Sequence, residues 1–165
     1  MEADCMMSGG DGLVAARHLH HYGYKPTIYY PKPGKNELYQ VSFPSSPPPY
    51  LTDSPQRLQT QLQHLSVPFT TDFPLALQET DHIIDAIFGF SFSGEIREPF
   101  PSIIAALAET RIPVTSIDAP SSWDIENGPP TEGPGMGFEP DILVSLTAPK
   151  PLVKFFKGRH FVGGR

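Results

Sequence analysis

This chain has little of what marks secreted, membrane-embedded or nucleic-acid-binding proteins. Cys5 is its only cysteine, which excludes an internal disulfide and suits a reducing compartment. No apolar run approaches the roughly 18 residues that a membrane-spanning helix needs, and the first residues lack the basic and apolar parts of a signal peptide. The net charge of −6 argues against nucleic acid or an anionic membrane as a partner. We therefore expect a soluble protein of the cytoplasm or the mitochondria, with no nucleic-acid and no membrane partner.

Proline, in contrast, is abundant. The chain has 20 prolines in 165 residues, against a usual share of roughly 5%. Five of these prolines fall between Pro44 and Pro55, in a stretch that is also rich in serine and has no periodicity. This composition predicts an irregular loop over residues 32–55. Residues 1–165 together are predicted to form a single domain, which is long enough to bury a core.

Helix and strand signals alternate along the rest of the chain. The segments with helical patterns or helix-boundary residues are Leu13–Tyr22, Gln56–Leu65, Leu75–Glu79 and Pro99–Thr110. The short runs of strand-forming residues are Pro26–Pro31, Val67–Phe69, His82–Phe88, Val114–Asp118, Asp141–Leu146 and Arg159–Val162. Strands that alternate with helices in this way predict an α/β fold with a mainly parallel sheet.

The segment from Asp85 to Phe100 combines a strand, a polar loop and a helix start. His82–Phe88 is a nearly continuous apolar run, as expected of a strand that is covered on both faces. Small and polar residues follow in Gly89–Glu95, and Pro99 then opens a helix at its first turn. In open α/β sheets, ligands bind beyond the carboxyl ends of the strands, so this order predicts a ligand-binding edge. The alternative is a buried strand with an ordinary loop after it.

Two carboxylates fall where carboxylates are uncommon. Asp85 lies inside the buried strand and Asp118 ends the next one. Buried carboxylates are rare unless they are paired, hydrogen-bonded or bound to a cation. If the two strands are neighbours, both carboxylates and the hydroxyl of Ser121 converge, and such oxygen ligands suit a hard cation better than zinc. The alternative for Asp118 is that it only caps its own turn.

A glycine-rich turn precedes the first predicted helix. Ser8-Gly9-Gly10-Asp11-Gly12 leads directly into Leu13–Tyr22. The backbone N–H groups and the positive dipole end of such a helix start can bind an anion such as phosphate. The turn lacks the lysine of the Walker motif and does not match the G-x-G-x-x-G fingerprint, so by itself it does not define a nucleotide site.

Four stretches in this order resemble the NAD(P)H-hydrate epimerase family, which is also known as the YjeF N-terminal domain. They are Ser8–Arg17, Ile84–Phe92, Ser116–Asp124 and Leu146–Lys150. The resemblance implies a Rossmann-like three-layer αβα sandwich with a mainly parallel sheet. It also implies an isomerase that interconverts the R and S forms of hydrated NADH and NADPH and uses a bound potassium ion. The partner would then be this small-molecule substrate, and a homodimer stays open.

The resemblance also assigns roles to residues. The substrate would contact the glycine-rich turn, the loop after the buried strand and one carboxylate, namely Met7, Ser8, Gly9, Gly10, Asp11, Gly89, Phe90, Ser91, Phe92, Ser93, Gly94, Glu95 and Asp118. Potassium would be held by Ser8, Asp85 and Ser121. We expect Asp118 to be the catalytic general acid/base at a ring hydroxyl next to nitrogen. Loss and return of the hydroxyl and reversible ring opening both remain open as routes.

The chain departs from the family pattern in three places. The family's first turn contains two asparagines, both absent here, so that Ser8 stands where one of them supplies a potassium ligand. Ser122 stands where the family has glycine in Pro-Ser-Gly-Trp-Asp. The strand before the glycine-rich turn, and the helices before it, are predicted to be missing, since Met1–Met7 contains few strand-forming residues. We therefore expect a marginally stable chain with weak or no activity. A non-catalytic module that binds a nucleotide or protein, or an inactive fragment, is the alternative function.

Overall fold

The computed structural model of the chain describes residues 4–7, 9–31, 55–90, 92 and 94–164. Residues 32–54 of the predicted Pro/Ser-rich loop lie outside this part. The strands are β1 (Asp4–Met7), β2 (Thr27–Tyr29), β3 (Phe69–Thr70), β4 (His82–Asp85), β5 (Val114–Ile117), β6 (Ile142–Leu146) and β7 (Arg159–Gly163). The helices are α1 (Gly10–His21), α2 (Pro55–His64), α3 (Phe73–Gln78), α4 (Phe100–Glu109) and the short 3-10 helix η2 (Pro151–Phe155). The α/β alternation predicted from the sequence is confirmed.

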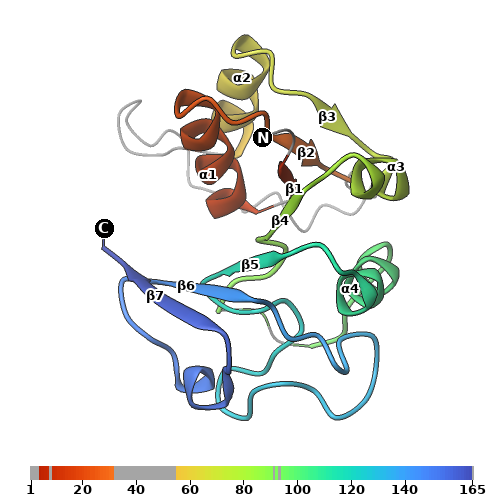
Figure 1. Ribbon diagram of the computed structural model, residues 1–165, viewed down its shortest axis with the longest axis vertical. Coiled ribbons are helices and arrows are strands. Elements are labelled where there is room, and N and C mark those ends of the chain that lie inside the picture. Colours follow the sequence, from red (N-terminus) through yellow and green to blue (C-terminus); the bar gives the residue numbers. More distant parts are fainter. Residues whose placement is uncertain (1–3, 8, 32–54, 91, 93, 165) are drawn as a thin grey trace, which may run out of the picture.

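All seven strands form one parallel sheet in the order β3-β2-β1-β4-β5-β6-β7 (Figure 1). Strands β1, β2 and β3 follow one another toward one edge of the sheet, and strands β4 to β7 follow one another toward the other edge. The strand order therefore reverses between β1 and β4. In open α/β sheets, the crevice at such a switch point is where ligands bind.

The prediction that the strand before the glycine-rich turn is missing is wrong. Asp4–Met7 forms β1, in the middle of the sheet, with Cys5 aligned to Thr27 of β2 and to Ile83 of β4. Strand propensity is a weak guide here, because a central strand gains its hydrogen bonds from the backbone of two neighbours, whatever side chains it carries. Because the central strand is present, there is no missing strand to lower the stability of the chain.

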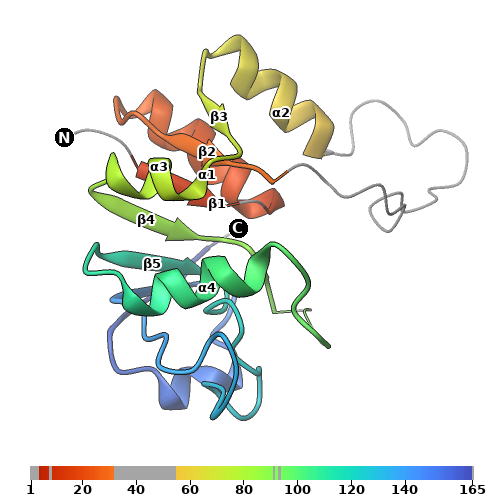
Figure 2. The same cartoon turned by 90° about the vertical axis from the view of Figure 1, so that its right-hand side faces the viewer.

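Helices cover both faces of the sheet, as Figures 1 and 2 show from two sides. Ile83 and Ile84 of β4 point to opposite faces because side chains alternate along a strand. Ile83 packs with α3 and α4 through Phe73 and Ile104, whereas Ile84 joins the cluster of α1 and α2 around Leu13 and Leu62. This arrangement confirms the predicted Rossmann-like three-layer αβα sandwich.

Strand β4 is shorter than the predicted His82–Phe88 run, because it ends at Asp85. The backbone N–H groups beyond it bond to side chains instead of to a neighbouring strand. Ile87 N donates to Asp85 Oδ1 at 3.4 Å, and Phe88 N donates to Ser121 Oγ at 3.2 Å. The chain therefore turns out of the sheet at the edge where the candidate site lies.

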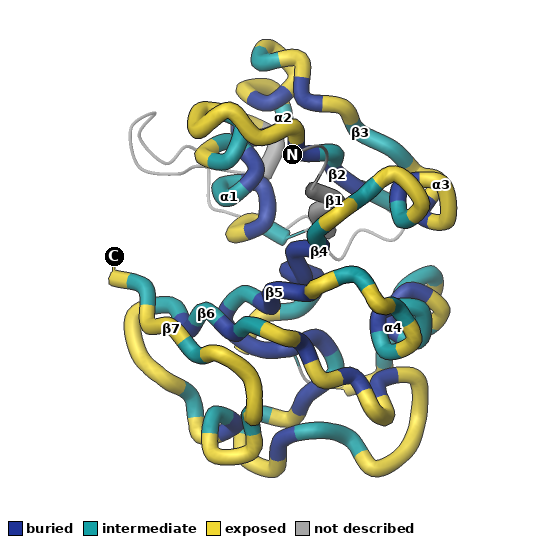
Figure 3. Tube along the Cα trace, viewed as in Figure 1, coloured by how far each residue is buried: buried dark blue, intermediate teal, exposed yellow. Residues whose placement is uncertain are grey.

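Burial is greatest in the middle of the sheet and falls off toward β7. In Figure 3, β4 and β5 are mostly buried, and β7 carries more exposed residues, including Phe161 and Val162. None of the helices in the described residues is both long enough and apolar enough to cross a membrane.

Candidate functional site

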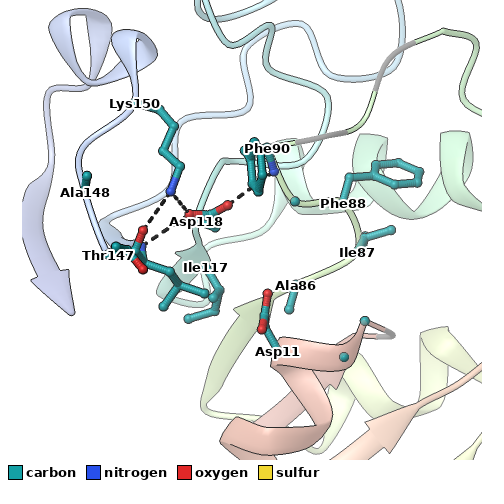
Figure 4. A pocket seen from close by; sticks show the side chains of 14 residues that line it. Asp11, Ala86, Ile87, Phe88, Phe90, Ile117, Asp118, Thr147, Ala148 and Lys150 are labelled. Carbon is teal, nitrogen blue, oxygen red and sulfur yellow. Dashed lines mark hydrogen bonds and ion pairs between the residues drawn. The ribbon is translucent and has the colours of Figure 1, made fainter. Parts of the chain in front are cut away.

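A cavity of about 490 Å³ opens at the carboxyl ends of β1, β4, β5 and β6 (Figure 4). It spans the switch point between β1 and β4, the position that the sheet topology indicates for a ligand. Its lining comes from the last residues of β5 and β6 and from the segments that follow the four strands, namely Gly9, Gly10, Asp11, Ala86, Ile87, Phe88, Gly89, Phe90, Ile117, Asp118, Leu146, Thr147, Ala148 and Lys150.

Gly9 allows the start of α1 to approach the end of β4. A Cβ atom at this position would collide with the carbonyl oxygen of Ala86, although the extended backbone at Gly9 would accept any residue. The absence of a side chain therefore brings the first turn of α1 to the wall of the cavity. The side chain of Asp11, which belongs to that turn, points toward the cavity from the side opposite Asp118 (Figure 4).

Asp118 lies between the loops that follow β4 and β6. Its Oδ2 accepts a hydrogen bond from Phe90 N at 3.3 Å, and its Oδ1 accepts one from Leu146 N at 3.3 Å. These donors are far from Asp118 in sequence, so the interpretation of Asp118 as a mere cap of its own turn is wrong. The backbone of Asp118 has a φ of 70°, a left-handed conformation that non-glycine residues adopt only when their surroundings enforce it.

Lys150 is the residue of this site that sequence reasoning missed. Its ammonium forms an ion pair with Asp118 Oδ1 and donates to the carbonyl oxygen of Leu146 at 2.8 Å. Its nitrogen also lies 5.3 Å from the centre of the Phe90 ring. The side chain of Lys150 is only 17% exposed. The sequence did show the motif Leu146–Lys150 directly after a strand, and that position was the available signal.

Asp85 and Ser121 form a second cluster, below the cavity wall. The Asp85 carboxylate is fully buried and accepts four hydrogen bonds from neutral donors. These donors are Ser116 Oγ at 2.7 Å, Ser121 N at 2.8 Å, Ser121 Oγ at 2.5 Å and Ile87 N at 3.4 Å. The predicted pairing of Asp85 with Ser121 is therefore present, and Ser116 completes it.

Burial raises the pKa of Asp85 above its ordinary value of 3.8, and the hydrogen bonds from Ser121, Ser116 and Ile87 oppose this rise only in part. A monovalent cation would supply the positive charge that these neutral donors lack. A carboxylate and a serine hydroxyl are also the oxygen ligands that hard cations prefer. The donor set of Asp85 and Ser121 thus fits the potassium ion that the family resemblance implies. Ser8, the third expected ligand, lies outside the described residues.

The two carboxylates do not converge on one spot, although β4 and β5 are neighbours. The side-chain hydrogen bonds of Asp118 and of Asp85 among the described residues share no partner. A short loop links them instead, since Phe88 N donates to Ser121 Oγ and Phe90 N donates to Asp118 Oδ2. The Asp85 cluster therefore fixes the loop whose far end contacts Asp118.

The structure brings about half of the predicted substrate-binding residues to the cavity. Those that line it are Gly9, Gly10, Asp11, Gly89, Phe90 and Asp118. Within the described part of the chain, Phe92, Gly94 and Glu95 do not line it, and the Phe92 ring stacks on Phe88 at 3.9 Å between centres. Met7 is described only as the last residue of β1. Ser8, Ser91 and Ser93 lie outside the described residues, and substrate contact by any of these residues stays a prediction.

Ser122 is strained in the turn after β5. Its φ is 81°, and its hydroxyl is buried without a hydrogen-bond partner among the described residues. The hydroxyl packs so closely against Gly135 that a Cβ atom there would overlap it. Both features follow from the presence of serine at a position where the resembling family has glycine, because glycine adopts a positive φ without strain.

A parallel αβα sandwich with a cavity at its topological switch point defines the class as a Rossmann-like domain. The family described as YjeF-related protein N-terminus matches residues 6–152, and the chain belongs to this family.

Relatives of known name support this assignment. The chain is 66% identical over 158 residues to an NAD(P)H-hydrate epimerase of Sclerotinia sclerotiorum, a match that covers 96% of this chain and 60% of the relative. It is 51% identical over 163 residues to an NAD(P)H-hydrate epimerase of Schizosaccharomyces pombe, covering 96% of this chain and 61% of the relative. The crystal structure of yeast ynu0 matches with a TM-score of 0.78 and 36% identity, over 99% of this chain and 67% of that one. The chain thus spans about 60% of the length of these curated relatives.

Proposed function

We propose that this protein is an isomerase that interconverts the R and S forms of hydrated NADH and NADPH. The name of relatives that are 66% identical supports the reaction, and the position of Asp118 in the wall of the cavity is the observation that carries the proposal. The substrate bears a hydroxyl on a ring carbon next to nitrogen. Inversion of that carbon needs a group that removes a proton from the hydroxyl oxygen and returns it.

Asp118 is suited to this proton transfer. Asp118 is 4% exposed and lines the cavity, and its carboxylate is held from three directions by Lys150, Leu146 and Phe90. A group that is fixed in this way needs little reorganisation when the proton moves, and general acid/base catalysis of this kind contributes about 10²–10⁴-fold to a rate.

The glycine-rich turn and the start of α1 provide the other half of the site. Gly9 and Gly10 place the backbone of the first helical turn at the cavity wall, where N–H groups and the helix dipole favour a negatively charged group such as a phosphate of the substrate. Asp11 adds an acceptor for hydroxyl or amide hydrogens from the opposite side of the cavity.

Potassium is part of the same proposal. Asp85 and Ser121 would hold the ion, which would supply positive charge beside a buried carboxylate. Within the chain itself, Ser121 Oγ already accepts from Phe88 N, so the cluster that would hold the ion also fixes the loop carrying Phe90. The role that follows is positioning of this loop and of Asp118, not proton transfer.

The direct test mixes the purified chain with one epimer of NADH hydrate and follows the other epimer by chromatography. We expect conversion well above the spontaneous rate, with a rate that is linear in enzyme concentration. A chain that binds the hydrate without converting it would be the non-catalytic module, and a chain that neither binds nor converts it would be an inactive fragment. Either result would contradict the proposed function.

A further inference from the structure

Lys150 is the only basic side chain among the described residues that line the cavity. The other titratable side chains in the described lining are Asp11 and Asp118. Lys150 follows β6, whereas Asp118 follows β5, so their ion pair joins two neighbouring segments at the same edge of the sheet. An ammonium group and a carboxylate that lie side by side at a cavity can act together on a bound ligand: the ammonium group donates a proton to one ligand atom, and the carboxylate accepts a proton from another.

The hydrogen-bond donors of Lys150 are not all used by the protein. An ammonium group has three N–H donors. Among the described residues, it has two acceptors, which are Asp118 Oδ1 and the carbonyl oxygen of Leu146. The remaining donor is available to a ligand in the cavity that Lys150 lines.

Asp118 keeps a matching acceptor. Its Oδ1 receives hydrogen bonds from Lys150 and Leu146 N, and its Oδ2 receives one from Phe90 N. A carboxylate offers about four lone-pair sites, so one site on Oδ2 remains. The pair thus presents one donor and one acceptor, on adjacent groups. Phe90, whose ring lies 5.3 Å from the Lys150 nitrogen, restricts the ammonium further through a cation–π contact.

We propose that Lys150 is a second catalytic residue, which gives a proton to the ring nitrogen of the substrate while Asp118 takes the proton of the adjacent hydroxyl. This inference rests on the proposed function. As the hydroxyl proton passes to Asp118, the O–H electron pair forms a C=O bond. The C–N electron pair moves to nitrogen, which accepts a proton from Lys150, and the ring opens.

The same pair then closes the ring. Rotation about the C–C bond beside the aldehyde presents the other face of the C=O group. When nitrogen attacks that face, it gives its proton to the Lys150 amine and the oxygen takes the proton of Asp118, so that the pair recovers its original charges and the hydroxyl carbon is inverted. Proton-transfer groups on one side of the ring suffice for this route.

Two substitutions separate catalysis by Lys150 from mere positioning of Asp118. Lys150→Met removes the charge, whereas Lys150→Arg keeps a positive charge beside Asp118 but does not release a proton, since a guanidinium stays protonated in proteins. We expect both variants to lose about 10²-fold or more in kcat, with KM changed only a few-fold. If Lys150→Arg keeps most of the wild-type kcat, Lys150 only positions Asp118 and the inference is overturned.

Chemical rescue excludes a simple steric effect of arginine. Lys150→Cys is made in a Cys5→Ala background, because Cys5 is the only native cysteine, and is then aminoethylated to rebuild an amine of nearly the same length. We expect kcat to recover at least about 10-fold and the basic limb of the pH–rate profile to move to lower pH, since this amine is a weaker base than lysine. Absence of recovery, or recovery with an unmoved limb, would contradict proton transfer by Lys150. If neither the folded Cys5→Ala parent nor the wild type converts the hydrate, the proposed function itself is contradicted.

Discussion

Asp85 and Asp118 lie at the ends of neighbouring parallel strands, with 0% and 4% of their surfaces exposed. Asp85 is surrounded by four neutral donors, and it is absent from the described lining of the cavity. Asp118 is paired with an ammonium group and lines the cavity. Burial alone therefore does not distinguish a carboxylate with a structural role from one that is placed to react with a ligand. Asp85 and Asp118 differ in the charge of their hydrogen-bond donors and in their access to the cavity.

This difference predicts separate consequences for the two residues. A substitution at Asp118 should change the chemistry and leave the chain folded, because Asp118 lines the cavity and is not a member of the hydrophobic core clusters. A substitution at Asp85 should change the stability and the cation response, because Ser116 Oγ and Ser121 N have no other acceptor among the described residues.

The largest expected effect is that of Asp118→Asn on turnover. The amide keeps the shape of the carboxylate but does not take a proton as a general base, so we expect kcat to fall by about 10²–10⁴-fold. The variant should stay folded but melt at a lower temperature, because Phe90 N and Leu146 N donate to different carboxylate oxygens and the single amide oxygen accepts from only one of them. Steady-state kinetics and a thermal melt of the same preparation check both statements. Near-normal turnover would remove Asp118 from the mechanism.

Asp85→Ala should have the largest effect on stability. The substitution leaves Ser121 N and the hydroxyl of Ser116 buried without their acceptor, and each such group costs about 1–3 kcal/mol. Chemical denaturation of the variant should therefore show a free energy of unfolding lower by at least about 2 kcal/mol. Ser116→Ala is the matched control, since it removes one donor and leaves no orphaned acceptor, and it should cost less than Asp85→Ala.

Gly9→Ala should destabilise the join between α1 and β4 by about 1–3 kcal/mol, as overpacking of a tight contact does. The added Cβ atom meets the carbonyl oxygen of Ala86, a backbone atom that cannot rotate away. Gly10→Ala is the control, because a Cβ atom at Gly10 meets no atom within 4 Å. A Gly9→Ala protein that melts at the same temperature as Gly10→Ala would show that the two segments separate easily.

The raised pKa of Asp85 makes the stability of the chain depend on pH. The folded state binds the Asp85 proton more tightly than the unfolded state does, so this contribution is fully present below the ordinary value of 3.8 and is lost as pH rises through the raised pKa. We expect the stability of the wild type, relative to Asp85→Asn, to fall over this window in a buffer free of potassium. If the proposed potassium site exists, potassium should reduce the fall, because it would bind the ionised form. Urea midpoints measured against pH, with and without potassium, check both signs. A difference that rises with pH would contradict the direction.

The smallest expected effect is a gain. Ser122→Gly removes a left-handed strain and a buried hydroxyl without a partner, so we expect stabilisation by about 1 kcal/mol, or about 2–4 °C in melting temperature for a chain of this size. Ser66→Gly is the control. Ser66 also has a positive φ, of 58°, but it is exposed, so its replacement should gain less. A lower melting temperature for Ser122→Gly would show that its hydroxyl has a partner after all.

The sequence predicted what depends on local pattern. The apolar run around Ile83 and Ile84 identified the central strand β4, and the alternation of segments identified the parallel sheet. An isolated carboxylate in an apolar strand needs a partner, and of the two residues expected to converge on Asp85, Ser121 does bond to it and Asp118 does not. Each of these inferences uses only neighbours in sequence or the rule that buried charge must be compensated.

The errors concern contacts that come from tertiary structure. β1 was missed because Asp4–Met7 has little strand propensity of its own and gains its structure from two partner strands. Lys150 was missed because its partner Asp118 is 32 residues away and the ion pair has no local pattern. The separation of Asp85 from Asp118 depends on where the loop from Phe88 to Phe90 turns, which the strand pattern does not specify.

The most direct test of the division between the two carboxylates is the ratio of epimerisation rates in potassium and in sodium, measured for the wild type, Asp118→Asn and Asp85→Asn. We predict a ratio clearly above one for the wild type. Asp118→Asn should be slow in both ions but keep that ratio, and Asp85→Asn should show a ratio close to one. An Asp85→Asn protein that keeps the wild-type ratio, or an Asp118→Asn protein that loses it, would contradict the account.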